Sequence, residues 1–341
     1  MDKVRFGLAG VGGIVREFHL QVMLQNPRVK IVAACDVRQD AVQSLAQQIG
    51  ISKTYTDFEL MAHDREIDAV LVATPNYFHA PITVKMLEGG KNVLCEKPMA
   101  TTPAEAKKML ASAEIAHKRL AIAHPWRCDQ DFRWLHDVIH SGRLGRIFKI
   151  RGHAVLTGES PPADSWRSDS QMAGGGALTD LGIHVIDTIS FLFDDRLRPV
   201  RVIALAGNFF TKAQVEDTAT VLIEFQDGIV AVIDAGWHHN FQHSPHGAIE
   251  VFGTEGYART FPTELQCRED GDWVCRRPSL HPDRPHIDVS MYAAQIDSFI
   301  DSVVSGSTPA CDMRQGLRNV VLLDAIYQSA RRAEPFSLKE Y

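Results

Sequence analysis

Short apolar runs alternate with helical patterns of apolar residues through the first third of the chain. The apolar runs predict strands that begin at Val4 and continue at 29–35, 67–73, 92–95 and 120–123. Helical patterns between the later runs predict helices at 40–49, 80–88 and 103–117. The run at 67–73 is continuous, which is typical of a strand covered on both faces of a parallel sheet. Regular alternation of strand and helix predicts a doubly wound sheet with its ligand at the carboxyl ends of the strands.

The pattern changes near His124, after which hairpin turns join the apolar segments. Strands are predicted at 146–155, 200–209, 219–225, 229–236 and 249–252, and helices at 132–141, 178–193, 290–305 and 314–333. Turns at 226–228 and 253–256 indicate a largely antiparallel sheet. A chain of 341 residues exceeds one ordinary core. We therefore expect an α/β domain at 1–123 and an α+β domain at 124–341, whose last helix is able to pack back on the first domain.

The turn after the first strand has the residues of a dinucleotide-binding Rossmann fold. Gly10 allows a tight turn, and Gly12 lets backbone N–H groups approach a pyrophosphate at the start of a helix. Asp36 follows at the end of the second strand, where a carboxylate accepts hydrogen bonds from a ribose diol. Val15 stands at the third glycine position, so we expect the helix to lie slightly further from the sheet. An ordinary turn without a ligand is the competing interpretation.

Asp36 and Arg38 bear on the choice between NAD and NADP. A carboxylate at position 36 binds a free 2′-hydroxyl and repels a 2′-phosphate, so we expect NAD. Arg38 could offset that repulsion by lying over the adenine or by pairing with a phosphate, or it could be a solvated loop charge. Use of NADP as well therefore stays open.

Composition excludes several classes of partner. The formal net charge of −6 gives no reason to expect nucleic acid or an anionic membrane as partner. No apolar run approaches the roughly 20 residues that span a bilayer. The first strand begins almost at once, so we expect no signal peptide.

Six cysteines occur without a C-x-x-C pair. Cys267 and Cys275 could face each other across a hairpin, but we expect reduced thiols and a cytoplasmic location.

The segment Glu96-Lys97-Pro98 follows a predicted parallel strand, and Thr74 ends another. A lysine at the mouth of a sheet can hydrogen-bond a substrate hydroxyl and stabilise a developing alkoxide. Pro98 fixes the direction of the chain, and a cis bond before it is a conformation that proline permits. The competing interpretation is a surface lysine after a turn.

A second chemical segment runs from Gly174 through Asp180 and His184 to Asp187. Three glycines at 174–176 would let the backbone come close to a ligand. Asp180 and His184 are four residues apart, so a helix places them on one face. Imidazole suits acid–base chemistry near neutral pH. A helix-start carboxylate beside a buried, satisfied histidine is equally consistent with the pattern, and we expect Asp187 to serve packing or hydrogen bonding.

Four segments in order resemble the Gfo/Idh/MocA oxidoreductases, which include glucose–fructose oxidoreductase and inositol dehydrogenase. The segments are 10–14, 73–79, 96–98 and 174–184, and the likeness continues through 253–256 and the final helix. The resemblance implies hydride transfer between a nicotinamide and a secondary alcohol of a sugar or cyclitol. It also implies an open C-terminal sheet that mediates oligomers, so we expect a homo-oligomer, either a dimer or a tetramer.

The resemblance further implies roles for individual residues. His184 matches the favoured proton acceptor, Lys97 orients the hydroxyl, and Asp180 supports the histidine. The cofactor side would be formed by Gly10, Gly12, Gly13, Ile14, Asp36, Arg38, Thr74, Asn76, His79, Glu96 and Lys97. The substrate side would be formed by Lys97, Arg127, Trp166, Arg167, Asp180 and His184.

Four more histidines cluster at positions 238, 239, 243 and 246. No supporting cysteine or carboxylate pattern accompanies His238, His239, His243 and His246, so we predict no metal site. We expect one of them, with His281 or His286, to contact substrate hydroxyls.

Three functions remain open at the level of sequence. The leading interpretation is an NAD-dependent sugar or cyclitol dehydrogenase. A glycosidase or lyase of the same fold would recycle NAD through a transient oxidation. A third interpretation is a protein that senses NAD(H) without turnover, although Lys97, Asp180 and His184 argue against it. The identity of the sugar depends on loops at 156–170, 236–245 and 277–288, whose conformations the pattern leaves undetermined.

Overall fold

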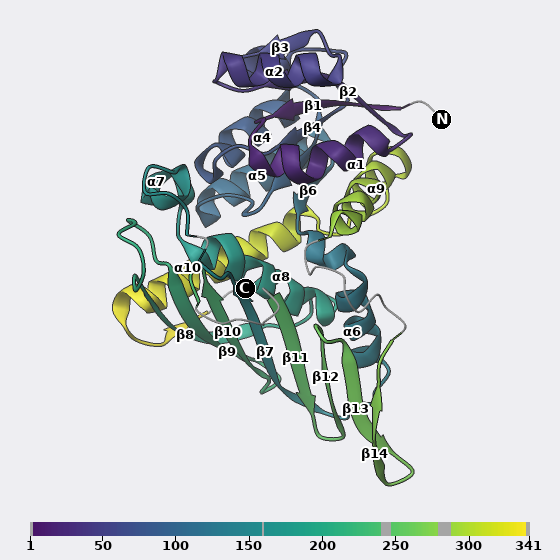
Figure 1. The fold of residues 1–341 in the computed structure, drawn as a ribbon, viewed down its shortest axis with the longest axis vertical. Helices are drawn as coiled ribbons and strands as arrows, with labels where there is room; N and C mark the ends of the chain where they lie inside the picture. The colour runs from purple at the N-terminus through teal and green to yellow at the C-terminus, as the bar shows by residue number, and fades with distance from the viewer. Residues whose placement is uncertain (1–2, 159, 240–246, 279–287, 339–341) are drawn as a thin grey trace. The chain divides into compact units, whose positions relative to one another are not determined.

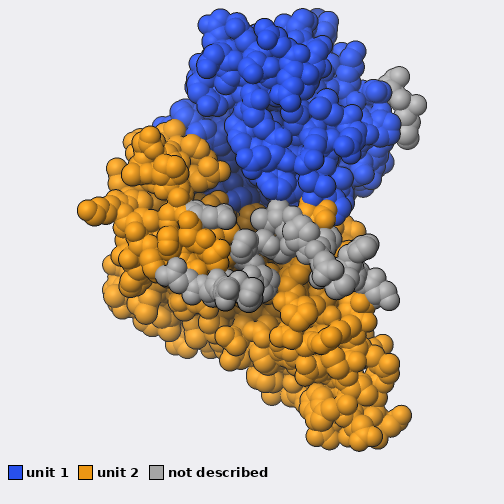
Figure 2. Space-filling model, in the orientation of Figure 1, with its two compact units in different colours: residues 1–125, 289–320 blue, residues 126–288, 321–341 orange. Residues whose placement is uncertain are grey.

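The computed structural model describes residues 3–158, 160–239, 247–278 and 288–338. The chain divides into two compact units, shown in different colours in Figure 2. Unit 1 comprises residues 1–125 and 289–320, and unit 2 comprises residues 126–288 and 321–341. Unit 1 thus ends two residues after the boundary expected from sequence and also includes a C-terminal segment. Among the helices of the described residues, none is long and apolar enough to span a membrane.

Unit 1 contains a six-stranded sheet in the order β3-β2-β1-β4-β5-β6 (Figure 1). All neighbouring strands are parallel. The strands are β1 (Val4–Ala9), β2 (Val29–Cys35), β3 (Lys53–Tyr55), β4 (Ala69–Val72), β5 (Asn92–Glu96) and β6 (Leu120–Ala123). The order reverses direction between β1 and β4, which is where ligands bind in such sheets. The predicted doubly wound parallel sheet is confirmed.

The helices of unit 1 follow the predicted spans within a few residues. They are η1 (Val15–His19), α1 (Leu20–Gln25), α2 (Gln39–Ile49), α3 (Phe58–Ala62), η2 (Asn76–Phe78), α4 (His79–Glu88), α5 (Pro103–Ala116) and α9 (Val289–Ser305). The strand β3 and the helix α3 were not predicted, because three and five residues are too few to display a period.

Unit 2 contains a nine-stranded sheet in the order β14-β13-β12-β11-β7-β10-β9-β8-β15. Its strands are β7 (Ile147–Val155), β8 (Pro199–Gly207), β9 (Thr218–Phe225), β10 (Val230–Gly236), β11 (Gly247–Gly253), β12 (Gly256–Arg259), β13 (Glu264–Glu269), β14 (Asp272–Arg276) and β15 (Phe336–Ser337). Among the described strands of this second sheet, only β7 and β10 pair in parallel. The mainly antiparallel sheet is therefore confirmed, with one parallel pair that the sequence did not indicate.

Cys267 lies on β13 and Cys275 lies on β14, which together form one hairpin. Cys267 lies opposite Val274, and Cys275 lies opposite Gln266, so the two thiols do not face each other. All six cysteines fall within the described residues and are free thiols, as expected.

One face of the unit 2 sheet is covered by helices, and the other is open. The helices of unit 2 include α6 (Gln130–His140), η4 (Trp166–Ser168), α7 (Ser170–Ala173), η5 (Leu178–Gly182) and α8 (Ile183–Leu192), with α10 (Met313–Arg332) shared between the two units. Of these, α6, η5 and α8 pack on the sheet. On β8 and β9 the residues Val202, Ala204, Val221 and Ile223 are buried, whereas Ile203, Leu205 and Leu222 are exposed. This alternation is what a half-covered sheet requires.

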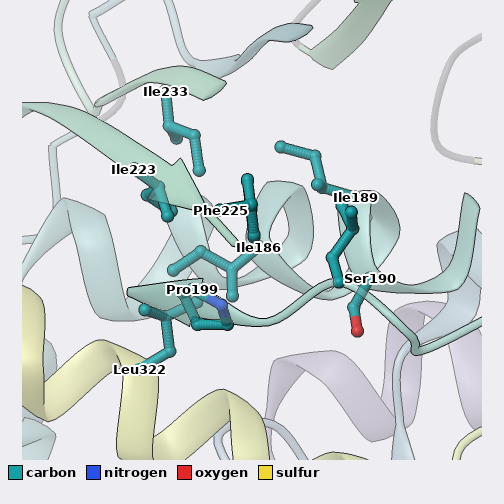
Figure 3. A pocket seen from close by; sticks show the side chains of 9 residues that line it. Ile186, Ile189, Ser190, Pro199, Ile223, Phe225, Ile233 and Leu322 are labelled. Atoms are coloured by element: carbon teal, nitrogen blue, oxygen red, sulfur yellow. The ribbon is translucent and has the colours of Figure 1, made fainter. Parts of the chain in front are cut away.

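The helix α8 packs tightly on the covered face. A gap of about 10 Å³ lies between α8 and the sheet, lined by Ile186, Ile189, Ser190, Leu197, Pro199, Ile223, Phe225, Ile233 and Leu322 (Figure 3). Such a volume holds at most one water molecule. The position of α8 is therefore fixed by apolar contact with β9 and β10.

We predict that Ile233→Ala lowers the free energy of unfolding by about 2–5 kcal/mol, because it enlarges an existing gap beneath α8. Ile233 is fully buried. Urea denaturation followed by circular dichroism measures the change. Ile115→Ala is the matched control, since that side chain is 81% exposed and its truncation should cost less than about 0.5 kcal/mol. Equal losses in both variants would contradict the packing described here.

Candidate active site

The turn between β1 and the first helix is shaped by glycine. Gly10 has φ +92°, and a Cβ there would lie 2.3 Å from the Ala73 carbonyl oxygen. Two features therefore require glycine at position 10: the positive φ and the close approach of the backbone that follows β4. A Cβ on Gly12 would meet no atom within 4 Å, and one on Gly13 would lie 3.5 Å from Glu17 Oε1. The backbone at Gly12 thus presents an open face at the start of the helix that Ile14 leads into.

Asp36 lies at the end of β2 beside this turn. Its Oδ2 accepts a hydrogen bond from the Val11 N–H at 3.0 Å, and its Oδ1 accepts from Arg38 Nε at 3.1 Å. Burial acts to raise the pKa of the Asp36 carboxyl, but the hydrogen bonds from Arg38 and Val11 prevail and lower it. Asp36 is therefore an ionised carboxylate near neutral pH. Arg38, whose side chain is 61% exposed, pairs with that carboxylate.

The first helix begins with a π turn, η1, that places His19 in the interior. His19 Nε2 lies 2.6 Å from Glu96 Oε1, both side chains are buried, and the edge of the imidazole meets Tyr292. Burial acts to raise the pKa of Glu96, but the contact with His19 outweighs it and lowers the pKa. Sequence reasoning missed His19. The available signal was the spacing of His19, which shares one helix face with the apolar Val15, Val22 and Met23.

The ends of β4 and β5 are joined by His79. Its Nδ1 lies 2.7 Å from the Pro98 carbonyl oxygen, and its Nε2 lies 2.9 Å from the Thr74 carbonyl oxygen. Burial lowers the pKa of His79, and the neutral ring, with one N–H, donates to only one of the two carbonyl oxygens at a time. The Lys97–Pro98 peptide is cis, a conformation that proline permits. His79 therefore holds the turn that carries Lys97.

Lys97 and Asn76 also lie just beyond the ends of β5 and β4. The Lys97 side chain is half-buried, and Asn76 is 7% exposed. The Lys97 N–H donates to Glu96 Oε2 at 3.2 Å. His19, Glu96 and the Lys97 backbone thus form one connected group in unit 1.

In unit 2, Asp180 and His184 are each fixed by a buried tryptophan. Trp237 Nε1 donates to Asp180 Oδ2 at 3.1 Å. The His184 ring stacks on Trp126, with ring centroids 5.3 Å apart and planes 26° from parallel. Asp180 and His184 are both half-buried, so each retains an accessible edge. Neither tryptophan was singled out from the sequence, because their partners lie 57 and 58 residues away.

The single predicted helix at 178–193 is instead a π turn, η5, followed by α8. Asp180 lies within the π turn, and His184 lies in the first turn of α8. Such widened turns are frequent at functional sites.

Two of the glycines at 174–176 lie close against other parts of the chain. A Cβ on Gly176 would lie 1.8 Å from the Glu216 carbonyl oxygen, and a Cβ on Gly175 would lie 2.0 Å from the Tyr327 hydroxyl oxygen. These two glycines make room for protein atoms. The space beside the backbone of Gly175 and Gly176 is thus filled by protein atoms, and the approach of a ligand to this segment stays a prediction.

Glu216 holds the start of the segment that carries Asp180. Its carboxylate accepts from the N–H of Gly176 at 3.0 Å, the N–H of Leu178 at 3.0 Å and the Tyr327 hydroxyl at 2.8 Å. Burial raises the pKa of the Glu216 carboxyl, because its donors are neutral and do not fully replace water. Glu216 lies two residues before β9, and nothing in the sequence around it indicated this role.

Arg127 is placed in the interior of unit 2. It is 2% exposed and forms ion pairs with Asp187 and Asp195, both at 2.8 Å. The substrate-side role of Arg127 stays a prediction, and contact with a substrate would require one of these ion pairs to open. Asp187 serves hydrogen bonding, as expected.

Trp166 and Arg167 lie in η4 and are half-buried, with the Arg167 guanidinium carbon 4.7 Å from the Trp166 ring centroid. His238 stacks on Phe210 with ring centroids 4.8 Å apart. No group of three metal-ligating residues forms around His238 and His239 within the part of the chain that the structure describes. The expectations for His243, His246, His281 and His286 lie outside the described residues.

Comparison with known proteins identifies both units. The model of the oxidoreductase family with an NAD-binding Rossmann fold matches residues 4–124, and the model of the GFO/IDH/MocA C-terminal domain matches residues 132–259. A 1,5-anhydro-D-fructose reductase from Ensifer adhaerens is 28% identical over 330 residues, which cover 96% of each chain. A myo-inositol 2-dehydrogenase from Thermotoga maritima is 26% identical over 99% of each chain.

A solved structure agrees with these relatives. GenD2 from gentamicin A biosynthesis, in complex with NAD, superposes with a TM-score of 0.86 at 25% identity and covers 100% of this chain and 97% of its own. Its fold is therefore that of this chain along the whole length. The two family models together extend over both units. The chain belongs to the Gfo/Idh/MocA family of oxidoreductases, and its first unit is an NAD-binding Rossmann domain.

Proposed function

We propose that the protein oxidises a secondary alcohol of a sugar or cyclitol and transfers the hydride to NAD. The observation that carries this proposal is the pair Asp180 and His184, each oriented by a buried tryptophan at the head of α8. The curated relatives support the substrate class, because their names are those of a sugar reductase and an inositol dehydrogenase.

The residues of unit 1 fit NAD. The backbone at Gly12 is open at a helix start, which suits a pyrophosphate. The ionised Asp36 suits the ribose diol and disfavours a 2′-phosphate. Arg38 already pairs with Asp36, so it is drawn away from a phosphate. When bound, NAD supplies the hydride acceptor at C4 of its nicotinamide.

Side chains of the protein then remove the hydroxyl proton, stabilise the developing alkoxide and orient the base. His184 accepts the proton of the substrate hydroxyl, and Lys97 donates a hydrogen bond to the developing alkoxide. The carbon–hydrogen bond breaks with its electron pair, so the alcohol becomes a ketone as the cofactor is reduced. Asp180 holds the imidazole in its working orientation, and Trp126 supports the ring from its face.

The open face of the unit 2 sheet supports a homo-oligomer as the state of the enzyme. Ile203, Leu222 and Val232 lie opposite one another in register on β8, β9 and β10. Leu205, on the same face as Ile203, is 71% exposed. An apolar row of this kind marks an interaction surface, and a second copy of the chain presents the same row. We propose pairing of two such faces.

We predict that His184→Ala and Lys97→Ala each lower turnover by at least about 100-fold, through loss of the base or of alkoxide stabilisation. Absorbance of reduced nicotinamide, with NAD and a panel of inositols, aldoses, anhydro-sugars and glycosides, measures turnover. His63→Ala and Lys107→Ala are exposed controls and should retain activity.

Unchanged turnover in both site variants would refute these catalytic roles. A flat signal with sugar released from a glycoside would identify the NAD-recycling lyase instead. Tight NAD binding without any product, across the whole panel, would favour an NAD(H) sensor.

We predict that Asp36→Ser shifts the ratio of kcat/KM for NAD over NADP towards NADP by at least about 10-fold. A 10-fold change corresponds to roughly 1.4 kcal/mol; the substitution removes the repulsion between the carboxylate and a 2′-phosphate and also releases Arg38. Steady-state kinetics with both cofactors measures the ratio. Arg38→Ala provides the contrast, since it keeps the carboxylate and should not improve the use of NADP. An unchanged ratio in Asp36→Ser would show that another group selects the cofactor.

We predict that Leu222→Lys lowers the molar mass measured by light scattering to that of a smaller assembly, because it places a charge in the centre of the apolar row. Ile115→Lys on α5 is the control. An assembly of unchanged mass in Leu222→Lys, or a monomeric parent protein, would refute the proposed interface.

A further inference from the structure

Two histidines and one aspartate converge on unit 2 outside the residues that the proposed function uses. His136 and His140 lie one turn apart at the end of α6, with ring centroids 4.3 Å apart. Asp194 follows α8 in a left-handed conformation with φ +53°, and its N–H donates to the Phe191 carbonyl oxygen at 3.0 Å. The three side chains thus come from the ends of two helices.

Their ligand atoms are spaced as a small metal ion requires. His136 Nε2 lies 3.0 Å from Asp194 Oδ1, and His140 Nε2 lies 3.7 Å from Asp194 Oδ2. All three residues offer ligand atoms within 4.8 Å of one another. Tetrahedral bonds of about 2.0–2.2 Å place neighbouring ligand atoms roughly 3.3 Å apart, so only small side-chain movements are needed.

The surroundings of His136 match those of a metal-bound imidazole. Its other nitrogen, Nδ1, lies 3.4 Å from Asp137 Oδ1, and metal-ligating histidines commonly direct their second nitrogen to a carboxylate. The ring also stacks on Phe191 with centroids 5.2 Å apart, which limits its rotation. Arg196 approaches Asp194 at 3.9 Å as a competing cation, but its side chain is 83% exposed and free to turn into solvent.

We propose that His136, His140 and Asp194 form a binding site for a first-row transition metal ion of the Zn²⁺, Ni²⁺ or Cu²⁺ type. Two imidazoles and one carboxylate suit these ions, whereas Mg²⁺ and Ca²⁺ prefer oxygen ligands alone. The ligand side chains are 25–40% exposed, so water completes the coordination shell. The site lies beyond the proposed catalytic set and has a structural consequence.

A bound ion joins the last turn of α6 to the residue that follows α8. The helix α8 carries His184 near its other end. The ion would therefore stabilise unit 2 against unfolding without taking part in hydride transfer.

The test is a titration of the chelator-treated full chain with ZnCl₂ in competition with a chromophoric zinc chelator. We expect His140→Gln to weaken Zn²⁺ binding by at least about 10-fold and the double variant His136→Asn/His140→Asn to abolish it at this site. His63→Gln is the matched control, because it removes an exposed histidine from unit 1. At a Zn²⁺ concentration about 100 times the dissociation constant, the midpoint of thermal unfolding should rise by about 3–5 °C in the parent protein and not in the double variant.

Electron paramagnetic resonance with Cu²⁺ reports the ligands directly and should show coupling to two nitrogens that is lost in the double variant. Circular dichroism and NAD binding confirm that the variants fold. Zn²⁺ binding of equal strength in the double variant would refute the site, as would binding only at millimolar concentrations. In either case the three residues form an ion-pair cluster and nothing more.

Discussion

Close contact between a glycine and a carbonyl oxygen from another segment shapes the start of both functional helices. In unit 1, Gly10 meets the end of β4, and in unit 2, Gly176 meets the backbone of Glu216. A side chain at either position would separate the helix start from the strand beside it. A π turn follows in both units, and a carboxylate accepts the backbone N–H groups of each preceding turn. Two unrelated folds therefore position their chemistry with the same local device.

The pKa of a buried carboxyl group in this protein depends on its hydrogen-bond partners, as three residues show. Burial works against ionisation at Asp36, Glu96 and Glu216 alike. Asp36 has Arg38 beside it and Glu96 has His19, so the pKa of each is lowered. Glu216 has only backbone N–H groups and a tyrosine hydroxyl, so its pKa is raised. The end of β2 is thus anionic at Asp36, whereas the start of the Asp180 segment rests on a carboxyl group that gives up its proton less readily.

The proposed chemistry depends on orientation more than on unusual side chains. His79 ties the turn of Lys97 to β4, Trp237 holds Asp180, and Trp126 supports His184. Asp180 and His184 are therefore each backed by a buried ring, and a third buried ring, that of His79, holds the backbone turn that carries Lys97. Preorganisation of this kind is what base catalysis and alkoxide stabilisation require.

Local pattern in the sequence determined the strand–helix order of unit 1, the glycine turn with Asp36 and the mainly antiparallel sheet of unit 2, because each depends on neighbouring residues. Short or half-exposed strands such as β3 and β13 were not predicted, because their few residues show no period. Only the tertiary structure decided the partners of His19, Arg127 and Glu216, and the close contacts of Gly175 and Gly176. Those contacts join residues that lie 38 to 273 positions apart, and the pairing of distant side chains depends on how whole elements pack rather than on any local pattern.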